Sequence, residues 1–223
     1  MHIYYDIEQK TDEWFNLKWG KISGTSSKDL FGAKKIKDLA VFDRIMGEKS
    51  SEVIIEEKGF VSLAMENGSI LEERARIELQ AERGIEFLEA GFIERTLTHG
   101  HSPDGISKDK KYGCEIKAPG LKAHNSYCRL NVLPKEYAPQ VVNMFACVDT
   151  LESLFFCSYN PNYKRMQLFV LEITRDYEIK IGTKTDTIGN HAKHLINRVD
   201  ELEEGIIDEI EILEERINNK TKF

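Results

Sequence analysis

Apolar residues recur with the period of an α-helix in several parts of the chain. In residues 68–83, GSILEERARIELQAER, leucine, alanine and leucine follow at four-residue steps, so a helix there would have one apolar face. Ser69 and Glu72 have the spacing of a capping box at its start. A short helix is also predicted over 11–20, and another over 137–149.

The longest helical pattern begins at about residue 187 and continues towards the C-terminus. Its apolar residues are separated by four, three, four, four, three and four positions, which places them in one stripe. The simplest expectation is that this stripe packs on its own domain, and contact between subunits of an oligomer is the alternative. The stripe consists of Leu195, Val199, Leu202, Ile206, Ile210, Leu213 and Ile217.

Short apolar segments bounded by polar turns predict β-strands. Three of them lie between the helix at 68–83 and the helix at 137–149, and two follow the second helix. The order helix, three strands, helix and two strands predicts an α/β or α+β protein in which helices pack on a sheet. The candidate strands are 85–94, 97–103, 113–118, 153–159 and 167–173.

The composition is that of an ordinary globular protein. The chain has 223 residues, of which 41% are hydrophobic and 31% are charged, and this length is enough to bury a sizeable core. No apolar run approaches the roughly 20 residues of a membrane helix. The N-terminus has no basic segment followed by an apolar one, so we expect a cytoplasmic protein with no membrane partner. None of the four cysteines lies in a CxxC pair, which argues against a zinc site.

The net charge of −7 comes from 31 basic and 38 acidic residues. An acidic chain argues against a nucleic-acid partner, because phosphate contacts need lysine and arginine. Residues 200–223, however, hold nine acidic and three basic residues, which leaves a net charge of −1 for residues 1–199. The acidity therefore belongs mainly to one C-terminal helix, and it does not exclude DNA as a partner of the rest.

The candidate chemistry lies in the pattern Pro-Asp, ten residues, Glu-Ile-Lys, which ends at Lys117. Side chains at i and i+2 share one face of a strand, so Glu115 and Lys117 point the same way and Ile116 points to the opposite face. A hairpin turn would place Asp104 beside Glu115. Two carboxylates and a main-chain carbonyl supply the hard oxygen ligands of magnesium. The metal would polarise a phosphate and acidify water, and the lysine would orient or activate the nucleophile.

Each of these residues also has a simpler interpretation. The short pattern fits a surface hairpin with one cross-strand salt bridge. Glu72 either brings a third carboxylate to the site or pairs with Arg76 on an exposed helix face. Gln140 alone is typical of a solvated helix. His99 and His101 would share one face of a strand, and we expect them to be surface histidines of a hairpin rather than DNA contacts.

Five blocks in a fixed order add a resemblance. They are EQKTDEWFNLKWGKISGTSS, NGSILEERARIEL, SPDGISKDKKYGCEIKAPG, YAPQVVNMFACVD and FFCSYNPNYKR. Over roughly residues 8–180, this set resembles the YqaJ-like viral recombinase family, which includes the phage lambda exonuclease. The resemblance implies a PD-(D/E)xK, restriction-endonuclease-like core, with a mixed central sheet flanked by helices. The long C-terminal helix predicted from periodicity would follow this core.

The same resemblance implies an activity and its partners. Family members are magnesium-dependent exonucleases, with one or two Mg²⁺ ions that Mn²⁺ can replace. They degrade one strand of linear double-stranded DNA in the 5′-to-3′ direction to mononucleotides and leave 3′ overhangs. They form homotrimeric rings around DNA and act with a single-strand-annealing recombinase. The alternatives are a restriction-type endonuclease of the same superfamily and a catalytically silent DNA-binding or structural member.

Position by position, the resemblance also implies roles for residues. Asp104, Glu115 and the main-chain carbonyl of Ile116 match the metal ligands, Lys117 matches the catalytic lysine, and Glu72 matches a helix glutamate near the second metal.

Three more residues match positions that bind substrate. Gln140 matches a glutamine that shapes the site. Lys18 and Thr25 fall where the family grips the terminal 5′ phosphate, usually with an arginine and a serine. Lysine keeps the charge of arginine but loses its bidentate fork.

We expect one nuclease domain, residues 1–223, with three parts. Residues 1–62 would form a helical part that binds the DNA end, and residues 63–181 would form the catalytic core. Residues 182–223 would form the acidic C-terminal helix.

Overall fold

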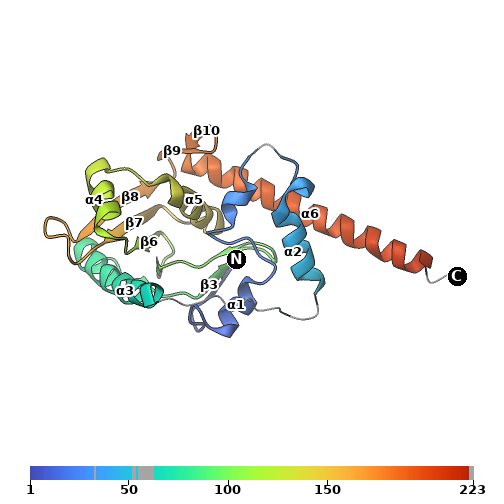
Figure 1. Cartoon of the computed structure of the whole chain (residues 1–223), viewed down its shortest axis with the longest axis horizontal. Coiled ribbons are helices and arrows are strands. Elements are labelled where there is room, and N and C mark those ends of the chain that lie inside the picture. The colour runs from blue at the N-terminus through green and yellow to red at the C-terminus, as the bar shows by residue number, and fades with distance from the viewer. Residues whose placement is uncertain (33, 52–53, 55–62, 221–223) are drawn as a thin grey trace.

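The computed structural model describes residues 1–32, 34–51, 54 and 63–220. Its centre is a five-stranded sheet (Figure 1). In order from one edge to the other, the strands are β2 (Phe87–Leu88), β5 (Gly105–Ser107), β6 (Tyr112–Lys117), β7 (Ser153–Tyr159) and β8 (Leu168–Thr174). β6 and β7 run parallel, whereas every other neighbouring pair is antiparallel. The prediction of a mixed central sheet is therefore confirmed.

A parallel pair of strands needs a crossover connection, and two helices supply it between β6 and β7. They are α4 (Leu121–Leu130) and α5 (Ala138–Cys147), with the 3₁₀ turn η3 (Lys135–Tyr137) before α5. The helix predicted over 137–149 is confirmed as α5. The helix α4 is an element that was not predicted from the sequence.

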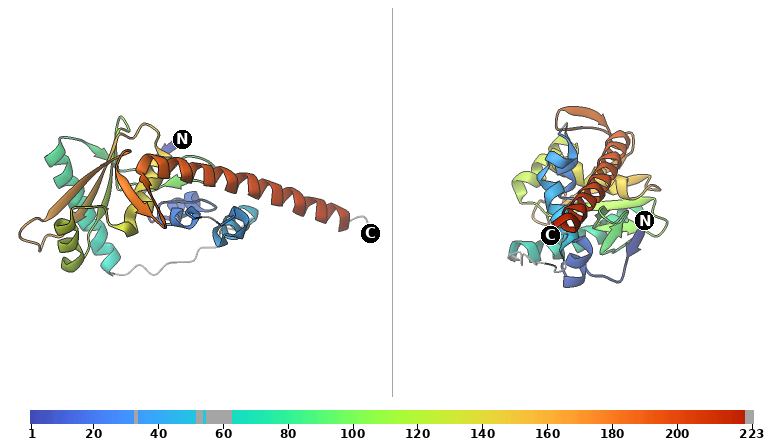
Figure 2. Two further views of the ribbon diagram at one scale, coloured as in Figure 1. Left: turned by 90° about the horizontal axis from the view of Figure 1, so that it is seen from above. Right: turned by 90° about the vertical axis from the view of Figure 1, so that its right-hand side faces the viewer.

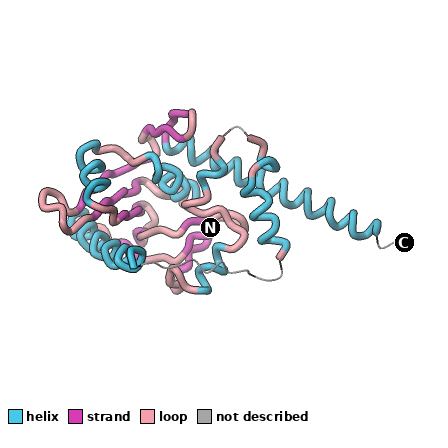
Figure 3. Tube along the Cα trace, viewed as in Figure 1, coloured by secondary structure: helices cyan, strands magenta, loops and turns pink. Residues whose placement is uncertain are grey.

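Helices cover both faces of the sheet (Figures 1 and 3). Ala75 and Leu79 of α3 (Leu63–Arg83) form one apolar core with Ile116 of β6. Val141 of α5 and Phe156 of β7 belong to a second core on the other face. Alternate residues of the central strands therefore belong to different cores, as the two-residue period of a strand requires.

The prediction of a single strand over 85–94 is wrong, because this segment contributes to two sheets. β2 joins the central sheet. The smaller second sheet has the order β1 (His2–Tyr4), β3 (Phe92–Glu94) and β4 (Gly100–His101). Gly91 lies where the chain leaves one sheet for the other. A Cβ atom at Gly91 would collide with the carbonyl oxygen of Ile7, so only glycine allows this close approach of two backbones.

The short helix predicted over 11–20 is α1 (Asp12–Lys18). The hydroxyl of Thr11 caps it by accepting a hydrogen bond from the backbone N–H of Trp14. The Trp14 indole N–H lies 2.9 Å from both the Gly91 carbonyl oxygen and the Ser102 hydroxyl, and so holds α1 against the segment that leads to Asp104. The chain then forms η1 (Ser27–Leu30), η2 (Ile36–Asp38) and α2 (Ala40–Ser50).

The capping box predicted at Ser69 is wrong, because α3 begins at Leu63 and Ser69 lies inside it. The preceding residues include leucine, alanine, methionine and glutamate, which are good helix formers. A capping signal does not start a new helix when the residues before it are already helical. Glu72 therefore lies in the third turn of α3.

The C-terminal helix α6 (Ile188–Lys220) follows the hairpin of β9 (Glu178–Ile181) and β10 (Lys184–Thr187). Its apolar stripe is buried from Leu195 to Ile206, but Leu213 is 39% exposed and Ile217 is 63% exposed. Figure 2 shows the distal half projecting beyond the body of the molecule. The expectation that the stripe packs on its own domain holds only for the proximal half. No helix in the described part of the chain is long and apolar enough to cross a bilayer.

Two matched substitutions on α6 test this division. Leu202→Ala is expected to lower the free energy of unfolding by about 2–5 kcal/mol, because Leu202 is fully buried. Leu213→Ala is expected to change it by at most about 0.5 kcal/mol in dilute, monomeric protein, because the side chain is exposed in the single chain. Urea unfolding of both variants measures the difference. A similar loss in both would show that the distal half is packed in solution.

Candidate active site

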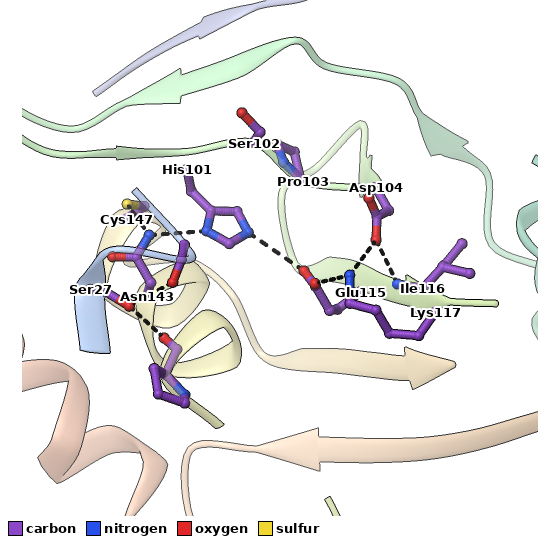
Figure 4. Close-up of polar contacts among 12 residues, drawn as sticks. Ser27, His101, Ser102, Pro103, Asp104, Glu115, Ile116, Lys117, Asn143 and Cys147 are labelled. Atoms are coloured by element: carbon purple, nitrogen blue, oxygen red, sulfur yellow. Dashed lines mark hydrogen bonds and ion pairs between the residues drawn. The ribbon is translucent and has the colours of Figure 1, made fainter. Parts of the chain in front are cut away.

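The backbone register of β5 and β6 places Asp104 beside Glu115. Gly105 pairs with Cys114, so the residue before Gly105 meets the residue after Cys114. The Asp104 carboxylate accepts a hydrogen bond of 2.6 Å from the backbone N–H of Ile116, as Figure 4 shows. This bond fixes the Asp104 carboxylate just before β5, next to the strand β6 that carries Glu115.

Lys117 lies on the same face as Glu115, as the strand period predicts. Its Nζ is 2.6 Å from Glu115 Oε1 and 3.9 Å from Asp104 Oδ2 (Figure 4). The Ile116 side chain is fully buried on the opposite face, against α3. Glu115 is only 4% exposed, so the interpretation as a solvated surface hairpin is wrong. Glu115 and Lys117 lie at the C-terminal end of β6, which is the middle strand of the central sheet.

The charges of these groups are strongly coupled. Burial, followed by the charge of Glu115, raises the pKa of Asp104 to about 6. Burial acts to lower the pKa of Lys117, but the charges of Glu115 and Asp104 outweigh it and raise the pKa above its ordinary value. Lys117 is therefore a firmly protonated cation in this site. One lysine beside two carboxylates leaves an excess of negative charge.

Glu72 of α3 lies near the same group. Burial and then the charge of Asp104 raise its pKa, while the charge of Lys117 acts to lower it. Glu72 and Asp104 line one cleft of about 490 Å³. The alternative partner Arg76 instead contacts the Glu89 carboxylate and lies 3.4 Å from the Asp104 carbonyl oxygen. Glu72 thus lines the cleft, and Arg76 pairs with Glu89 in its place.

The donor set fits a small divalent cation. Within the described ranges, no group of three or more His, Cys, Asp or Glu side chains lies close enough to hold a metal ion by itself. Magnesium does not need one, because it commonly binds through one or two carboxylates and takes its other ligands from water and substrate phosphate. Asp104 and Glu115 could supply the two carboxylates, and the excess negative charge there would favour a bound cation.

Two histidines and an asparagine form a buried polar chain behind this group. His99 and His101 are 0% and 2% exposed, so the expectation of surface histidines is wrong. Asn143 of α5 joins them, with its Oδ1 2.8 Å from His99 Nε2 and its Nδ2 3.0 Å from His101 Nδ1. His101 Nε2 lies 3.9 Å from Glu115 Oε2 (Figure 4). Burial lowers the pKa of His99 to about 4 and that of His101 to about 3, so both rings are neutral.

The polar chain was missed although the sequence contains one signal for it. Asn143 stands alone in the apolar run VVNMFAC, and every residue of that run is buried. A buried amide needs hydrogen-bond partners, so an isolated asparagine in such a run indicates a polar contact across the core.

Of the residues predicted to bind the 5′ phosphate, Thr25 belongs to a turn that lies against His101. A Cβ atom at Gly24 would be 3.1 Å from the His101 ring and 3.7 Å from Gln140 Cγ, so the turn that carries Thr25 lies against both side chains. Thr25 is exposed. Gln140 is not solvated as its simpler interpretation required, because its Oε1 is buried without a hydrogen-bond partner among the described residues. Lys18 Nζ lies 3.8 Å over the Trp14 ring, and burial followed by Arg44 lowers its pKa to about 8.

The raised pKa of Asp104 predicts a pH-dependent gain in stability when its charge is removed. The cost of the charge to stability develops as the pH rises above the ordinary pKa of 3.8 and is complete above about 6. Asp104→Asn is therefore expected to stabilise the metal-free protein by about 1–3 kcal/mol at pH 8 and to leave it unchanged near pH 4. Urea unfolding with a chelator at both pH values measures this. Equal effects at the two pH values would contradict the coupling.

Comparison with known proteins places the chain among relatives in sequence and in fold. The sequence model of the YqaJ-like viral recombinase domain matches residues 13–150. The alkaline exonuclease LHK-Exo from Laribacter hongkongensis is 23% identical and has a TM-score of 0.71, over 94% of this chain and 99% of that chain. LHK-Exo in complex with dAMP is 24% identical with a TM-score of 0.68, over the same shares.

A phage-related exonuclease from Haemophilus somnus 129PT is 13% identical, with a TM-score of 0.51 over 88% of this chain and 99% of that chain. These likenesses show a shared fold. No curated protein sequence matches the chain. Because the family match spans more than half of its length, the chain belongs to the YqaJ-like viral recombinase domain family.

Proposed function

We propose that the protein is a magnesium-dependent exonuclease. It degrades one strand of linear double-stranded DNA from the 5′ end to mononucleotides and leaves 3′ overhangs for recombination by single-strand annealing. The observation that carries the proposal is the convergence of Asp104, Glu115 and Lys117 on one buried face of the sheet in a chain of this family. The exonuclease likeness of the solved structures supports it.

Each residue of this group has a distinct task in the proposed reaction. Asp104, Glu115 and the Ile116 carbonyl oxygen hold the metal, and Glu72 serves a second ion. Bound Mg²⁺ supplies a Lewis acid that polarises the scissile phosphate and lowers the pKa of water. Lys117 keeps its proton between the two carboxylates, so it orients the attacking water and the phosphate instead of accepting a proton. Mn²⁺ has similar oxygen preferences and would replace Mg²⁺.

The DNA end would be held on the side of Lys18, Thr25 and Gln140. A terminal phosphate there would meet a lysine whose burial already disfavours its charge, so a dianion would restore that charge. It would also meet the Gln140 side chain, whose buried amide is unpaired on its oxygen side among the described residues. Lysine offers one point charge where arginine offers a fork, so the preference for a phosphorylated end is moderate.

The rest of the chain would serve assembly. In the proposed scheme residues 1–62 bind the DNA end, 63–181 form the catalytic core and 182–223 form the acidic helix, all in one domain. The enzyme would be cytoplasmic, would form a homotrimeric ring and would act with a single-strand-annealing recombinase. The exposed apolar residues on the distal half of α6 are suited to contact between subunits. The near-neutral charge of residues 1–199 is compatible with DNA as a partner.

Digestion of end-labelled linear duplex DNA with Mg²⁺ tests the proposal. Asp104→Ala and Lys117→Ala are each expected to lower the rate by at least about 100-fold, because each removes a group that acts on the phosphate. Lys111→Ala is the matched control, since Lys111 pairs with Glu152 in an exposed contact and should keep full activity. Labelled nucleotides should leave from the 5′ end, and a chelator should stop the reaction.

The alternatives give different outcomes in the same assay. A restriction-type endonuclease would cut circular duplex DNA, which an exonuclease leaves intact. A catalytically silent member would digest neither substrate with any divalent metal. Full activity of purified Asp104→Ala or Lys117→Ala would refute the assigned site.

The role of Lys18 is tested with 5′-phosphorylated and 5′-hydroxyl ends. We expect the wild-type protein to prefer the phosphorylated end by about tenfold, as for one hydrogen bond to a charged group. Lys18→Ala should abolish this preference, and Lys18→Arg should increase it by adding a bidentate contact. A preference that is unchanged in Lys18→Ala would place the phosphate elsewhere.

A further inference from the structure

His101 lies at the back of the proposed metal site and has no role in the function described above. Its ring is 2% exposed and is enclosed between the turn at Gly24, helix α5 and strand β6. The Nε2 atom points at Glu115 Oε2 across 3.9 Å, as Figure 4 shows. This buried atom has no hydrogen-bond partner among the described residues. A buried polar atom without a partner, aimed at a carboxylate, calls for a functional explanation.

The hydrogen bonds of Asn143 determine which ring nitrogen of His101 carries the proton. Asn143 Nδ2 lies 2.9 Å from the carbonyl oxygen of Gly100, which can only accept, so this atom is the amide nitrogen. Its second hydrogen points at His101 Nδ1, 3.0 Å away, which therefore accepts. The amide Oδ1 in turn accepts from His99 Nε2 at 2.8 Å. A neutral imidazole that accepts at Nδ1 carries its hydrogen at Nε2.

The Nε2–H group of His101 therefore faces Oε2 of Glu115, a proposed metal ligand. Glu115 Oε1 contacts Lys117 at 2.6 Å, and Glu115 Oε2 faces His101. We propose that His101 is a positioning residue: its Nε2–H holds Oε2 of Glu115 and so keeps Oε1 directed at Lys117 and the metal. This role rests on the proposed nuclease function. The present separation exceeds hydrogen-bond length, and contacts of this kind often shorten when the reacting complex forms.

The surroundings make His101 a rigid support. Asn143 holds its Nδ1 edge, and a Cβ atom at Gly24 would lie 3.1 Å from Cε1, so the ring already fills the available space. A carboxylate rotates freely about its last torsion, and a fixed donor behind it removes that freedom. Groups that orient metal ligands in this way contribute about 10- to 100-fold to metal affinity or activity.

Substitutions at His101 test the donor directly through metal binding. His101→Leu and His101→Asn both remove the donor at the Nε2 position, whereas His101→Gln places an amide nitrogen near it. Mn²⁺ binding, followed by the paramagnetic resonance signal of the free ion, needs no catalysis. We expect the dissociation constant to rise about tenfold in the first two variants and to stay within about threefold of wild type in His101→Gln.

His191→Leu is the matched control for the loss of a buried imidazole. His191 is also 2% exposed and has a backbone partner, with its Nε2 3.1 Å from the Ile179 carbonyl oxygen on the far side of the fold. This variant should lose thermal stability but bind Mn²⁺ like the wild type.

The same proteins are compared in DNA digestion across Mg²⁺ concentrations. His101→Leu and His101→Asn should need about tenfold more Mg²⁺ for half-maximal rate, with the KM for DNA unchanged.

Several results would overturn the role of His101. Wild-type Mn²⁺ affinity in folded His101→Leu or His101→Asn would do so, and either variant decides alone if the other does not fold. A loss in His101→Gln as large as in His101→Leu would also do so. If the wild-type protein neither binds Mn²⁺ nor digests linear duplex DNA, the nuclease function itself fails. If the wild-type protein does both and the His101 variants behave like it, only the positioning role fails.

Discussion

The pairing of Gly105 with Cys114 is the constraint on which the site depends. It places Asp104 opposite Glu115 and lets the Asp104 carboxylate accept from the Ile116 N–H. A shift of one residue in this register would turn every side chain of β6 to the other face, because strand side chains alternate. The carboxylates would then be separated and Ile116 would leave its core. Packing and chemistry therefore require the same register.

β6 serves both purposes because its two faces differ. Ile116 is fully buried against α3, which anchors the strand, while Glu115 and Lys117 turn to the side covered by α5. On that side the core is interrupted by Asn143 and the two histidines. Asn143 hydrogen-bonds to one ring nitrogen of each histidine, while His99 Nδ1 and His101 Nε2 have no hydrogen-bond partner among the described residues. Burial strengthens each electrostatic interaction there and also makes the uncompensated carboxylates costly. This cost, visible in the raised pKa of Asp104, is what a bound cation would relieve.

Much of the fold followed from local periodicity. The helix at 137–149 and the C-terminal helix agree with prediction, because each has a long apolar pattern of one period. The mixed central sheet also agrees, but it was implied by the family resemblance and not by a local pattern. The errors have local causes as well. Ser69 resembles a helix cap, but good helix formers precede it, and 85–94 reads as one strand although Gly91 lets the chain pass to a second sheet. Strands of two or three residues, such as β2 and β4, carry too little pattern to be predicted.

The sequence by itself determined that Glu115 and Lys117 share a face, because that depends only on the two-residue period of one strand. Their ordered neighbours also indicated the family. Only the tertiary structure decided that His101 meets Asn143, 42 residues away, and that Asp104 bonds to Ile116 across two strands. It also decided where the stripe of α6 ceases to be buried. Such contacts join residues distant in the chain, and no local period records which surfaces come together when the core closes.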